Sequence, residues 1–310
     1  MRGQKTGAGT QLPLCDSWGN IMRKQINSFF SVIIYVLTAF SVLALGFVIY
    51  FIVKEALPLF SEVSVPEFLF GTRWMPVDYT GSTSFGIANF IAATVYVSFT
   101  ALILALGIGL GAAMFLSFVA TERMRSFLYP FVDLLAGIPS VVYGFIGLQV
   151  LVKLFMKAGV HTGSCVLAAG ILLAIMLLPF LISSCSETML KEKGKYEAAA
   201  GTLGIDRWYV AATMILPASR RNILLSVILA IGRAMGETMA VMMVMGNANL
   251  FPKLLGKSES IASVIALEMG TAVYKSTHYH ALYAAGLVLM GILFIINVTI
   301  NIIRNRIIKD

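Results

Sequence analysis

Two side chains of opposite charge stand inside one long apolar stretch of the sequence. Arg233 and Glu237 lie four residues apart in the segment Gly-Arg-Ala-Met-Gly-Glu-Thr-Met-Ala-Val, residues 232–241. In a continuous helix this spacing places both side chains on one face. An arginine at the centre of a bilayer costs at least about 2.5 kcal/mol on insertion scales, so it normally faces a bundle interior or an aqueous cavity. The planar guanidinium donates hydrogen bonds in pairs and suits a tetrahedral oxyanion.

Two interpretations of this pair stay open from the residues alone. The pair is either an internal ion pair that holds helices together, or Arg233 is a cation on an anion pathway. In the second case Glu237 holds the arginine in position and partly offsets its positive charge. Ser140 and Tyr143 follow Pro139, which should kink or break its helix. These two side chains could line the same pathway, although proline-bent helices also serve packing in membranes.

A second segment, residues 197–217, has the features of a docking surface. Gly204 and Pro217 interrupt a run of helix formers, so we expect a short helix, a glycine break and a second short helix. A simple turn between two spans needs only a few residues. Arg207 and Trp208 are residue types that anchor protein interfaces. The alternative is a generic amphipathic loop.

The composition indicates that lipid surrounds most of the chain. Of the 310 residues, 58% are hydrophobic and 12% are charged, whereas a soluble domain carries about 25% charged residues. Six apolar segments have about the length that a helix needs to cross the hydrocarbon. We therefore predict an all-α membrane protein with six transmembrane helices, because helices satisfy their own backbone groups in lipid. The six segments are 31–53, 88–119, 127–155, 164–182, 223–245 and 281–303.

The distribution of Lys and Arg predicts that both termini lie in the cytoplasm. The two tails and the segments after spans two and four hold 15 of the 23 basic residues, the opposite loops hold 7, and Arg233 lies inside a span. The net charge of +8 is thus explained by basic residues that set the orientation of the chain in the membrane. We expect no nucleic-acid partner.

Several segments resemble the permeases of ATP-binding-cassette importers. From Gly204, a nine-residue gap leads to Met214, Leu216 and Pro217 in register with the signature loop of that family, although Glu197 lies one residue too far upstream. The segment 232–241 is similar to the fifth span of phosphate-specific permeases of the PstC type. Residues 137–145 and 265–269 resemble two further segments of the same type.

The resemblance implies a type I importer-permease fold, with a transmembrane permease domain at 31–303, cytoplasmic tails at 1–30 and 304–310, and a coupling loop at 186–220. It implies an ATPase-coupling set of Gly204, Arg207, Trp208, Leu216 and Pro217. It implies a phosphate pathway near Arg233, Glu237, Ser140 and Tyr143. The implied partners are a PstA-like sister permease, two copies of a cytoplasmic ATPase, an extracytoplasmic phosphate-binding protein and the lipid of a bacterial inner membrane.

The sequence predicts neither an enzyme nor a cofactor in this chain. Gly256-Lys257-Ser258 lacks the Walker A glycine five positions earlier, where Phe251 stands, so we expect ATP hydrolysis on a partner subunit. The spacing of the three histidines and three cysteines predicts no metal site. The alternatives are a permease for another oxyanion such as sulfate or molybdate, an ion-coupled secondary transporter, and a membrane scaffold without transport.

Overall fold

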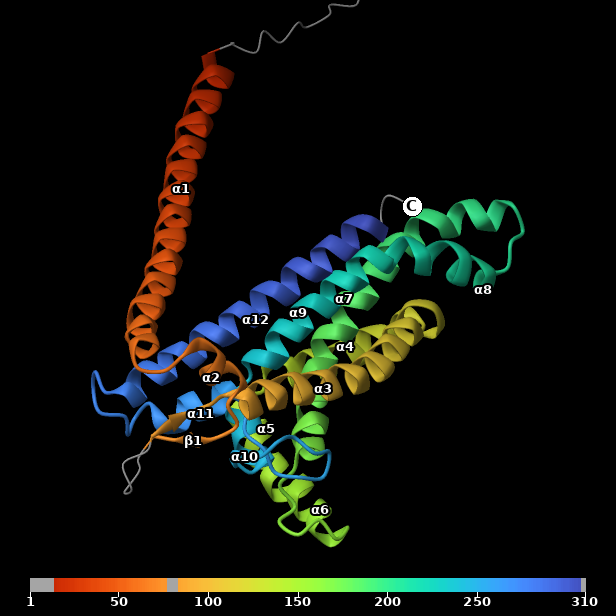
Figure 1. Ribbon diagram of the computed structural model, residues 1–310. Helices are drawn as coiled ribbons and strands as arrows, with labels where there is room; N and C mark the ends of the chain where they lie inside the picture. Colours follow the sequence, from red (N-terminus) through yellow and green to blue (C-terminus); the bar gives the residue numbers. More distant parts are fainter. Residues whose placement is uncertain (1–13, 77–82, 308–310) are drawn as a thin grey trace, which may run out of the picture. The chain divides into compact units, whose positions relative to one another are not determined.

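The computed structural model describes residues 14–76 and 83–307, and helices make up most of this part of the chain (Figure 1). Among these residues, six helical segments are long and apolar enough to cross a membrane. Each overlaps one predicted span, so the six predicted spans are confirmed. The segments are Phe29–Ser61, Ala88–Val119, Ser140–Lys157, Val166–Thr202, Arg207–Gly236 and Thr277–Ile302.

The described elements follow one another in a simple order, with a single small hairpin among the helices. In chain order they are α1 (Leu14–Ala56), η1 (Leu57–Ser61), α2 (Val65–Phe70), β1 (Trp74–Met75), β2 (Ser84–Phe85), α3 (Ala88–Met114), η2 (Phe115–Val119), α4 (Glu122–Gly137), α5 (Ser140–Ile146), η3 (Gly147–Val152), α6 (Lys153–Lys157), α7 (Val166–Thr202), α8 (Arg207–Val210), η4 (Ala211–Ile215), α9 (Leu216–Gly236), α10 (Met239–Met245), α11 (Ile261–Glu268) and α12 (Thr277–Ile307). The segments η2, η3 and η4 are π-helical turns, and η1 is a 3-10 turn.

Helix α1 belongs to a separate unit, residues 1–52. It begins at Leu14, within the segment assigned above to the N-terminal tail. Every side chain from Phe29 to Phe51 is exposed. A helix that is apolar on all sides needs lipid or another protein around it. The apolar side chains of the first span therefore need contacts with lipid or with another protein.

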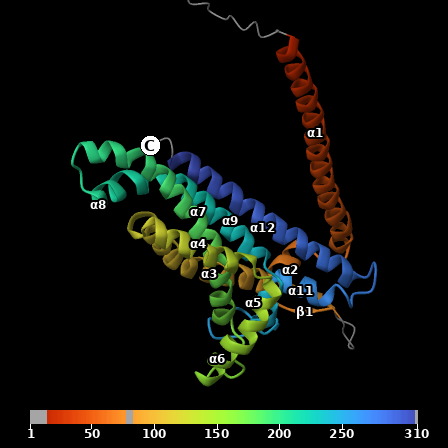
Figure 2. The same ribbon diagram turned by 180° about the vertical axis from the view of Figure 1, so that it is seen from behind.

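Helices α3 and α7 form the central pair of the second unit, with α7, α9 and α12 side by side (Figures 1 and 2). A Cβ added at Gly170 of α7 would lie 2.9 Å from the Thr100 Cγ2 atom, and one at Gly109 of α3 would lie 3.2 Å from the Leu181 Cβ atom. Small residues at such crossings let helices approach closely, which matters in lipid because no hydrophobic force draws helices together. Gly107, in contrast, has no neighbour within 4 Å.

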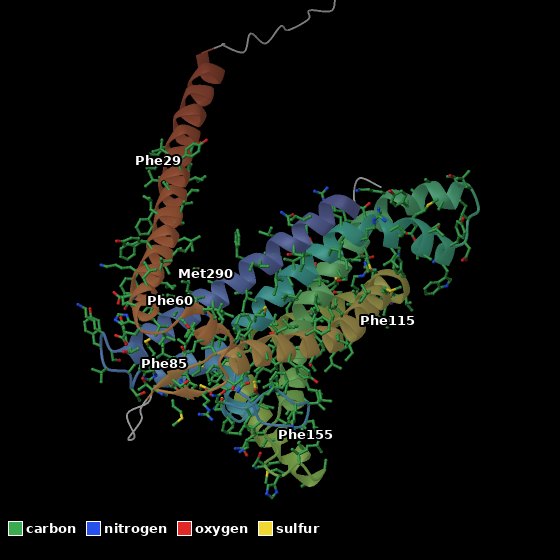
Figure 3. The ribbon with its side chains drawn as sticks, viewed as in Figure 1. Phe29, Phe60, Phe85, Phe115, Phe155 and Met290 are labelled. Carbon is green, nitrogen blue, oxygen red and sulfur yellow. The ribbon has the colours of Figure 1, made fainter. Side chains whose placement is uncertain are left out.

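A second core lies at one end of the second unit. It combines the β1–β2 hairpin, in which Trp74 pairs with Phe85, with residues of α2, α3, α11 and α12. Trp74 makes edge contacts with Phe85 and Phe90, each at 5.6 Å between ring centroids. Phe60 and Phe85 are labelled in this region in Figure 3. The short helix α11 contributes Ile261 and Val264 to this core.

The third and fifth spans are broken helices, and the prediction of an uninterrupted span at 223–245 was wrong. Helix α4 ends at Gly137 and α5 starts after Pro139, which confirms the break predicted at this proline. Helix α9 ends at Gly236, and α10 starts after Thr238. The second break has no proline, and the residues at its ends make local bonds that replace those of a continuous helix.

The predicted coupling loop is shorter than expected. Helix α7 continues to Thr202, and α8, η4 and α9 form a nearly continuous helix from Arg207 onward. The glycine break at Gly204 is confirmed, but the two flanking helices are the ends of spans four and five rather than separate short helices.

Replacement of Gly170 by valine tests the close approach of α3 and α7. We expect Gly170→Val to destabilise the protein by about 1–3 kcal/mol, because the new side chain would overlap Thr100. Gly107→Val is the matched control, since it adds the same side chain where space is open. Thermal unfolding in one detergent gives the comparison, and equal melting temperatures for the two variants would contradict the packing argument.

Candidate functional site

The charged pair of span five does not share a helix face. Arg233 lies in the last turn of α9, whereas Glu237 follows the end of that helix with φ −72° and ψ 120°, an extended conformation. The predicted i, i+4 geometry is therefore wrong, and no ion pair between the two side chains occurs in the described part of the chain. The Glu237 Oε1 atom instead accepts a bond of 3.5 Å from the Ala240 N–H. The carboxylate thus caps the first turn of α10, which competes with continuation of α9.

Arg233 and Tyr143 belong to different spans and interact electrostatically. The Arg233 side chain is exposed in this chain, and its charge acts on the Tyr143 hydroxyl. Tyr143 is buried, and its hydroxyl donates a 2.9 Å bond to the Leu135 carbonyl oxygen across the Pro139 break. Ser140 is half-buried at the start of α5. The predicted pathway residues therefore lie on two breaks, one in each of two packed spans.

Gly144 allows the two broken spans to pack closely against each other. A Cβ at this position would lie 2.8 Å from the Met243 Sδ atom and 3.1 Å from the Ala240 Cα atom of α10. One turn further on, a Cβ at Gly147 would meet Leu172 at 2.8 Å. Gly144 was absent from the predicted site residues. The sequence feature that could have indicated this contact is a small residue one helical turn after Ser140, because small residues permit close helix packing.

The turn between α7 and α8 is built on Gly204, whose φ of +66° favours glycine. The Gly204 N–H bonds to the Gly201 carbonyl at 3.4 Å, and the Ile205 N–H bonds to the Ala200 carbonyl at 3.1 Å. These two bonds form a Schellman motif that ends α7. Asp206 then caps α8 by accepting from the Trp208 N–H at 3.0 Å and from the Tyr209 N–H at 3.3 Å. The reversal of the chain is thus fixed by local bonds.

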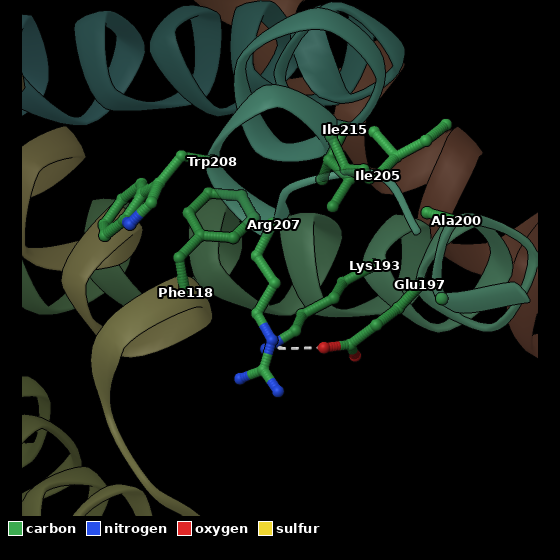
Figure 4. Close-up of a pocket in the computed structure, with 10 residues that line it drawn as sticks. Phe118, Lys193, Glu197, Ala200, Ile205, Arg207, Trp208 and Ile215 are labelled. Atoms are coloured by element: carbon green, nitrogen blue, oxygen red, sulfur yellow. Dashed lines mark ion pairs between the residues drawn. The ribbon is translucent and has the colours of Figure 1, made fainter. Parts of the chain in front are cut away.

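Two of the predicted docking residues, Arg207 and Trp208, line a pocket of about 340 Å³ at this turn (Figure 4). Trp208 is 62% exposed, so its ring is available to another protein. The Lys193–Glu197 ion pair, 3.9 Å long, lines the same pocket as Arg207. Glu197 is therefore part of this surface even though it is out of register with the sequence pattern. The residues that line the pocket are Phe118, Lys193, Glu197, Ala200, Gly201, Ile205, Arg207, Trp208, Val210 and Ile215.

Leu216 and Pro217 lie at the start of α9, after the π-helical turn η4. Leu216 packs against a buried cluster that contains Val210 and Ile215. Pro217 has no N–H, and its ring would clash with the carbonyl of Thr213 in a regular helix. The wider turn directly before Pro217 avoids that clash. These two residues therefore support the docking surface from behind.

A polar network that the sequence did not reveal connects this surface to α3 and α4. The Lys193 ammonium donates a 3.0 Å bond to the Ser117 carbonyl oxygen in η2. The Ser117 hydroxyl lies 3.3 Å from the Ser186 carbonyl oxygen in α7, and the Tyr129 hydroxyl of α4 lies 2.8 Å from the Ser186 Oγ atom. Serine and tyrosine in apolar runs give no sequence signal of mutual contact. Tertiary packing brings them together.

No group of three or more His, Cys, Asp or Glu side chains is placed to hold a metal ion in residues 14–76 and 83–307. Cys165 and Cys185 are buried free thiols. The arrangement thus offers a cation that acts on a hydroxyl of another span and an exposed aromatic at the Gly204 turn. These are features of binding and docking.

Comparison with known proteins fits this arrangement. Residues 105–309 match the family described as binding-protein-dependent transport system inner membrane component. The chain is 33% identical to the probable ABC transporter permease protein YqgH of Bacillus subtilis, over 80% of each chain. It is 32% identical to the phosphate transport system permease protein PstC of Xylella fastidiosa, over 85% of this chain and 88% of that one. The probable PstC of Methanocaldococcus jannaschii is 33% identical, over 87% and 88%.

The fold agrees with a solved transporter. A structure of the inward-facing MetNI methionine ABC transporter matches with a TM-score of 0.57 and 14% identity, over 71% of this chain and 95% of that chain. The fold and site define a multi-pass membrane protein of the importer-permease fold. The chain belongs to the family of inner-membrane components of binding-protein-dependent transport systems.

Substitution of Gly204 tests the turn. Gly204→Ala should weaken the end of α7 by about 1–2 kcal/mol, because an L-residue with a side chain is strained at positive φ. Gly204→Asn should lose less, since asparagine tolerates this conformation. Gly201→Ala is the control, because Gly201 is helical and has open space around it. Amide hydrogen exchange across residues 200–209 measures the effect. Equal protection in the Gly204→Ala and Gly201→Ala variants would argue against the motif.

Proposed function

We propose that the chain is the permease subunit of an ATP-driven phosphate importer and forms part of its translocation pathway. The observation that carries the proposal is the exposed Arg233 side chain in the last helical turn before the break of span five, where its charge acts on the Tyr143 hydroxyl of span three. The PstC relatives supply the substrate class. An anion that crosses lipid needs a compensating positive charge within the membrane, and Arg233 lies near the middle of the predicted span 223–245.

Arg233 is available for an oxyanion because Glu237 is engaged elsewhere. The Glu237 carboxylate caps α10, so it partly offsets the positive charge of Arg233 without forming an ion pair with the guanidinium. Charge-assisted bonds from a guanidinium to phosphate oxygens are strong and directional. Tyr143 and Ser140 supply hydroxyl groups at the other break. We assign these four residues to the pathway, with Arg233 as the principal contact.

The cytoplasmic surface around Trp208 receives an ATPase in this proposal. Trp208 and Arg207 are exposed, and tryptophan and arginine dominate the binding energy of many interfaces. Gly204 sets the turn, and Leu216 and Pro217 support it. Two ATPase copies, a PstA-like sister permease and an extracytoplasmic phosphate-binding protein complete the importer. ATP hydrolysis belongs to the ATPase partner, and this chain needs no cofactor.

The Lys193 bond to Ser117 supports a route for the coupling movement. A shift of the turn moves α7, and α7 is bonded to η2 and to Tyr129 of α4 at its cytoplasmic end. Helix α4 leads directly to the Pro139 break and the pathway residues of α5. The chain sits in a bacterial inner membrane with both termini in the cytoplasm, as the distribution of basic residues favours.

Loss of the Arg233 charge should reduce phosphate uptake. Removing a charge-assisted hydrogen-bond partner costs about 1.5–3 kcal/mol, so Arg233→Gln should lower uptake about tenfold or more. Lys157→Gln, which removes an exposed charge on α6, should keep normal uptake. Uptake of labelled phosphate in cells with equal membrane levels of each variant is the measurement. Normal uptake by the Arg233→Gln variant would exclude the pathway role, and competition by sulfate or molybdate would favour another oxyanion.

Truncation of Trp208 should weaken ATPase binding. Hot-spot truncations cost at least about 2 kcal/mol, so Trp208→Ala should raise the dissociation constant about 30-fold. Phe251→Ala is the control, because Phe251 is similarly exposed, at 67%, in an outward segment. Titration of the partner ATPase onto the importer membrane complex in nanodiscs gives both constants. An unchanged constant for the Trp208→Ala variant would place the docking surface elsewhere.

A further inference from the structure

A segment on the outward side, residues 246–260, is bonded to the helix bundle at several points, and we call it the strap. The Ser258 N–H donates to the Met245 carbonyl at 3.3 Å, and the Ser258 hydroxyl donates to the Leu250 carbonyl at 2.8 Å. The Gly256 and Leu254 carbonyls accept from the first two N–H groups of α7, at 3.0 and 2.9 Å. The strap therefore occupies one defined position against α7 and α10.

Glu259 is buried in this strap, and its carboxyl group has no partner among residues 14–76 and 83–307. Its side chain is 7% exposed, and its neighbours Ser258 and Ser260 are 0% and 2% exposed. The backbone after it is fixed, because Ser260 caps α11 and the Ile261 N–H donates to the Thr94 hydroxyl at 3.0 Å. No hydrogen bond or ion pair among the described residues involves the Glu259 carboxyl. The surrounding buried side chains Asn89, Thr94, Ser258, Ser260 and Ser263 are all hydrogen-bonded.

A second carboxylate sets the charge around Glu259. Glu268 of α11 accepts bonds from the Trp74 Nε1 atom at 2.8 Å and makes a 2.7 Å contact with the His278 Nε2 atom. These contacts hold Glu268 in place. Burial and the Glu268 charge raise the pKa of Glu259 from 4.5 to about 7.

No cation compensates the Glu259 carboxyl. In the described chain it makes no ion pair with a basic side chain. The outward half of α3 carries Tyr96 as its one titratable group, and α10 carries none. The other titratable groups of the strap and of the outward parts of the elements around it are Arg73, Lys153, Lys157, Lys253, Lys257, Glu268, His278, Tyr279, His280 and Tyr283.

We propose that the Glu259 carboxyl is a proton-binding site that keeps the strap in its packed position while protonated and loosens it when ionised. A neutral carboxylic acid can stay buried at modest cost, whereas an unpaired carboxylate in the same place is strongly disfavoured. The strap holds the end of α10 through Met245, so the proton also stabilises the outward end of the fifth span. This inference does not depend on the identity of the transported substrate.

The direction of the pH dependence follows from the raised pKa. Below about pH 4.5 the acid is protonated whether the strap is packed or open, so pH has no effect there. As the pH rises from about 4.5 through about 7, the open strap releases its proton first, and the packed position loses stability. Above about pH 7 the loss is complete.

Hydrogen exchange of the strap amides tests the proposal in the full chain in nanodiscs. After correction for intrinsic exchange rates, protection of residues 246–260 should fall about tenfold between about pH 6 and about pH 8.5. Glu259→Gln keeps the neutral shape and should show no fall. Glu67→Gln, which removes an exposed carboxyl on the same side, should show the same fall as the original protein.

Two results would overturn the proposal. One is equal protection at both pH values in the unaltered protein, and the other is an unchanged fall in the Glu259→Gln variant. An infrared titration of the unaltered protein gives an independent check that needs no variant. The carbonyl band of a buried protonated carboxyl should disappear as the pH rises through about 7, and its absence at the lower pH would equally exclude the site.

Discussion

The structure depends on one constraint, which is that lipid offers no partner to an open backbone group. Two of the six spans are nevertheless interrupted, and each interruption carries its own substitutes. At the first, the Tyr143 hydroxyl satisfies the Leu135 carbonyl, and at the second, Glu237 caps α10 while the Thr238 hydroxyl bonds the Gly236 carbonyl at 3.3 Å. Polar side chains therefore appear in the membrane where the backbone needs them. The exposed Arg233 and the half-buried Ser140 lie at the same two breaks. The polar groups that satisfy the backbone and the residues of the proposed pathway therefore occur together.

Close packing follows from the same constraint, because broken helices are stable in lipid only where other helices surround them. Gly144 lets α5 reach the backbone of α10, and Gly170 lets α7 reach α3. The two short helices after the breaks therefore share contacts rather than standing separately. Movement of α5 would have to be followed by α10, which makes the pair a single body on the outward side of the breaks.

Much of the fold could be predicted from the sequence because the thickness of the bilayer sets the length of an apolar run. Six spans, the proline break and the glycine turn were predictable for that reason. The break at Glu237 was not, since glycine, glutamate and threonine in an apolar run do not forbid a helix. The contact of Lys193 with Ser117 and the burial of Glu259 arise from tertiary packing between distant segments, which no local pattern of residue types reports. In the candidate site, Arg233, Tyr143 and Trp208 were predicted from the sequence, whereas the contact of Gly144 with α10 and the place of Glu197 in the pocket were not.

Helix α7 is long enough to connect the two sides of a membrane mechanically. Its 37 residues correspond to a length of about 55 Å. Strap carbonyls bond its first turn, and its last turns line the pocket beside Trp208. The buried Pro179 gives this rod one site at which it can bend. One continuous helix therefore connects the pocket at the Gly204 turn to the strap. A displacement of α7 at the pocket would move the strap directly, because no loop lies between them.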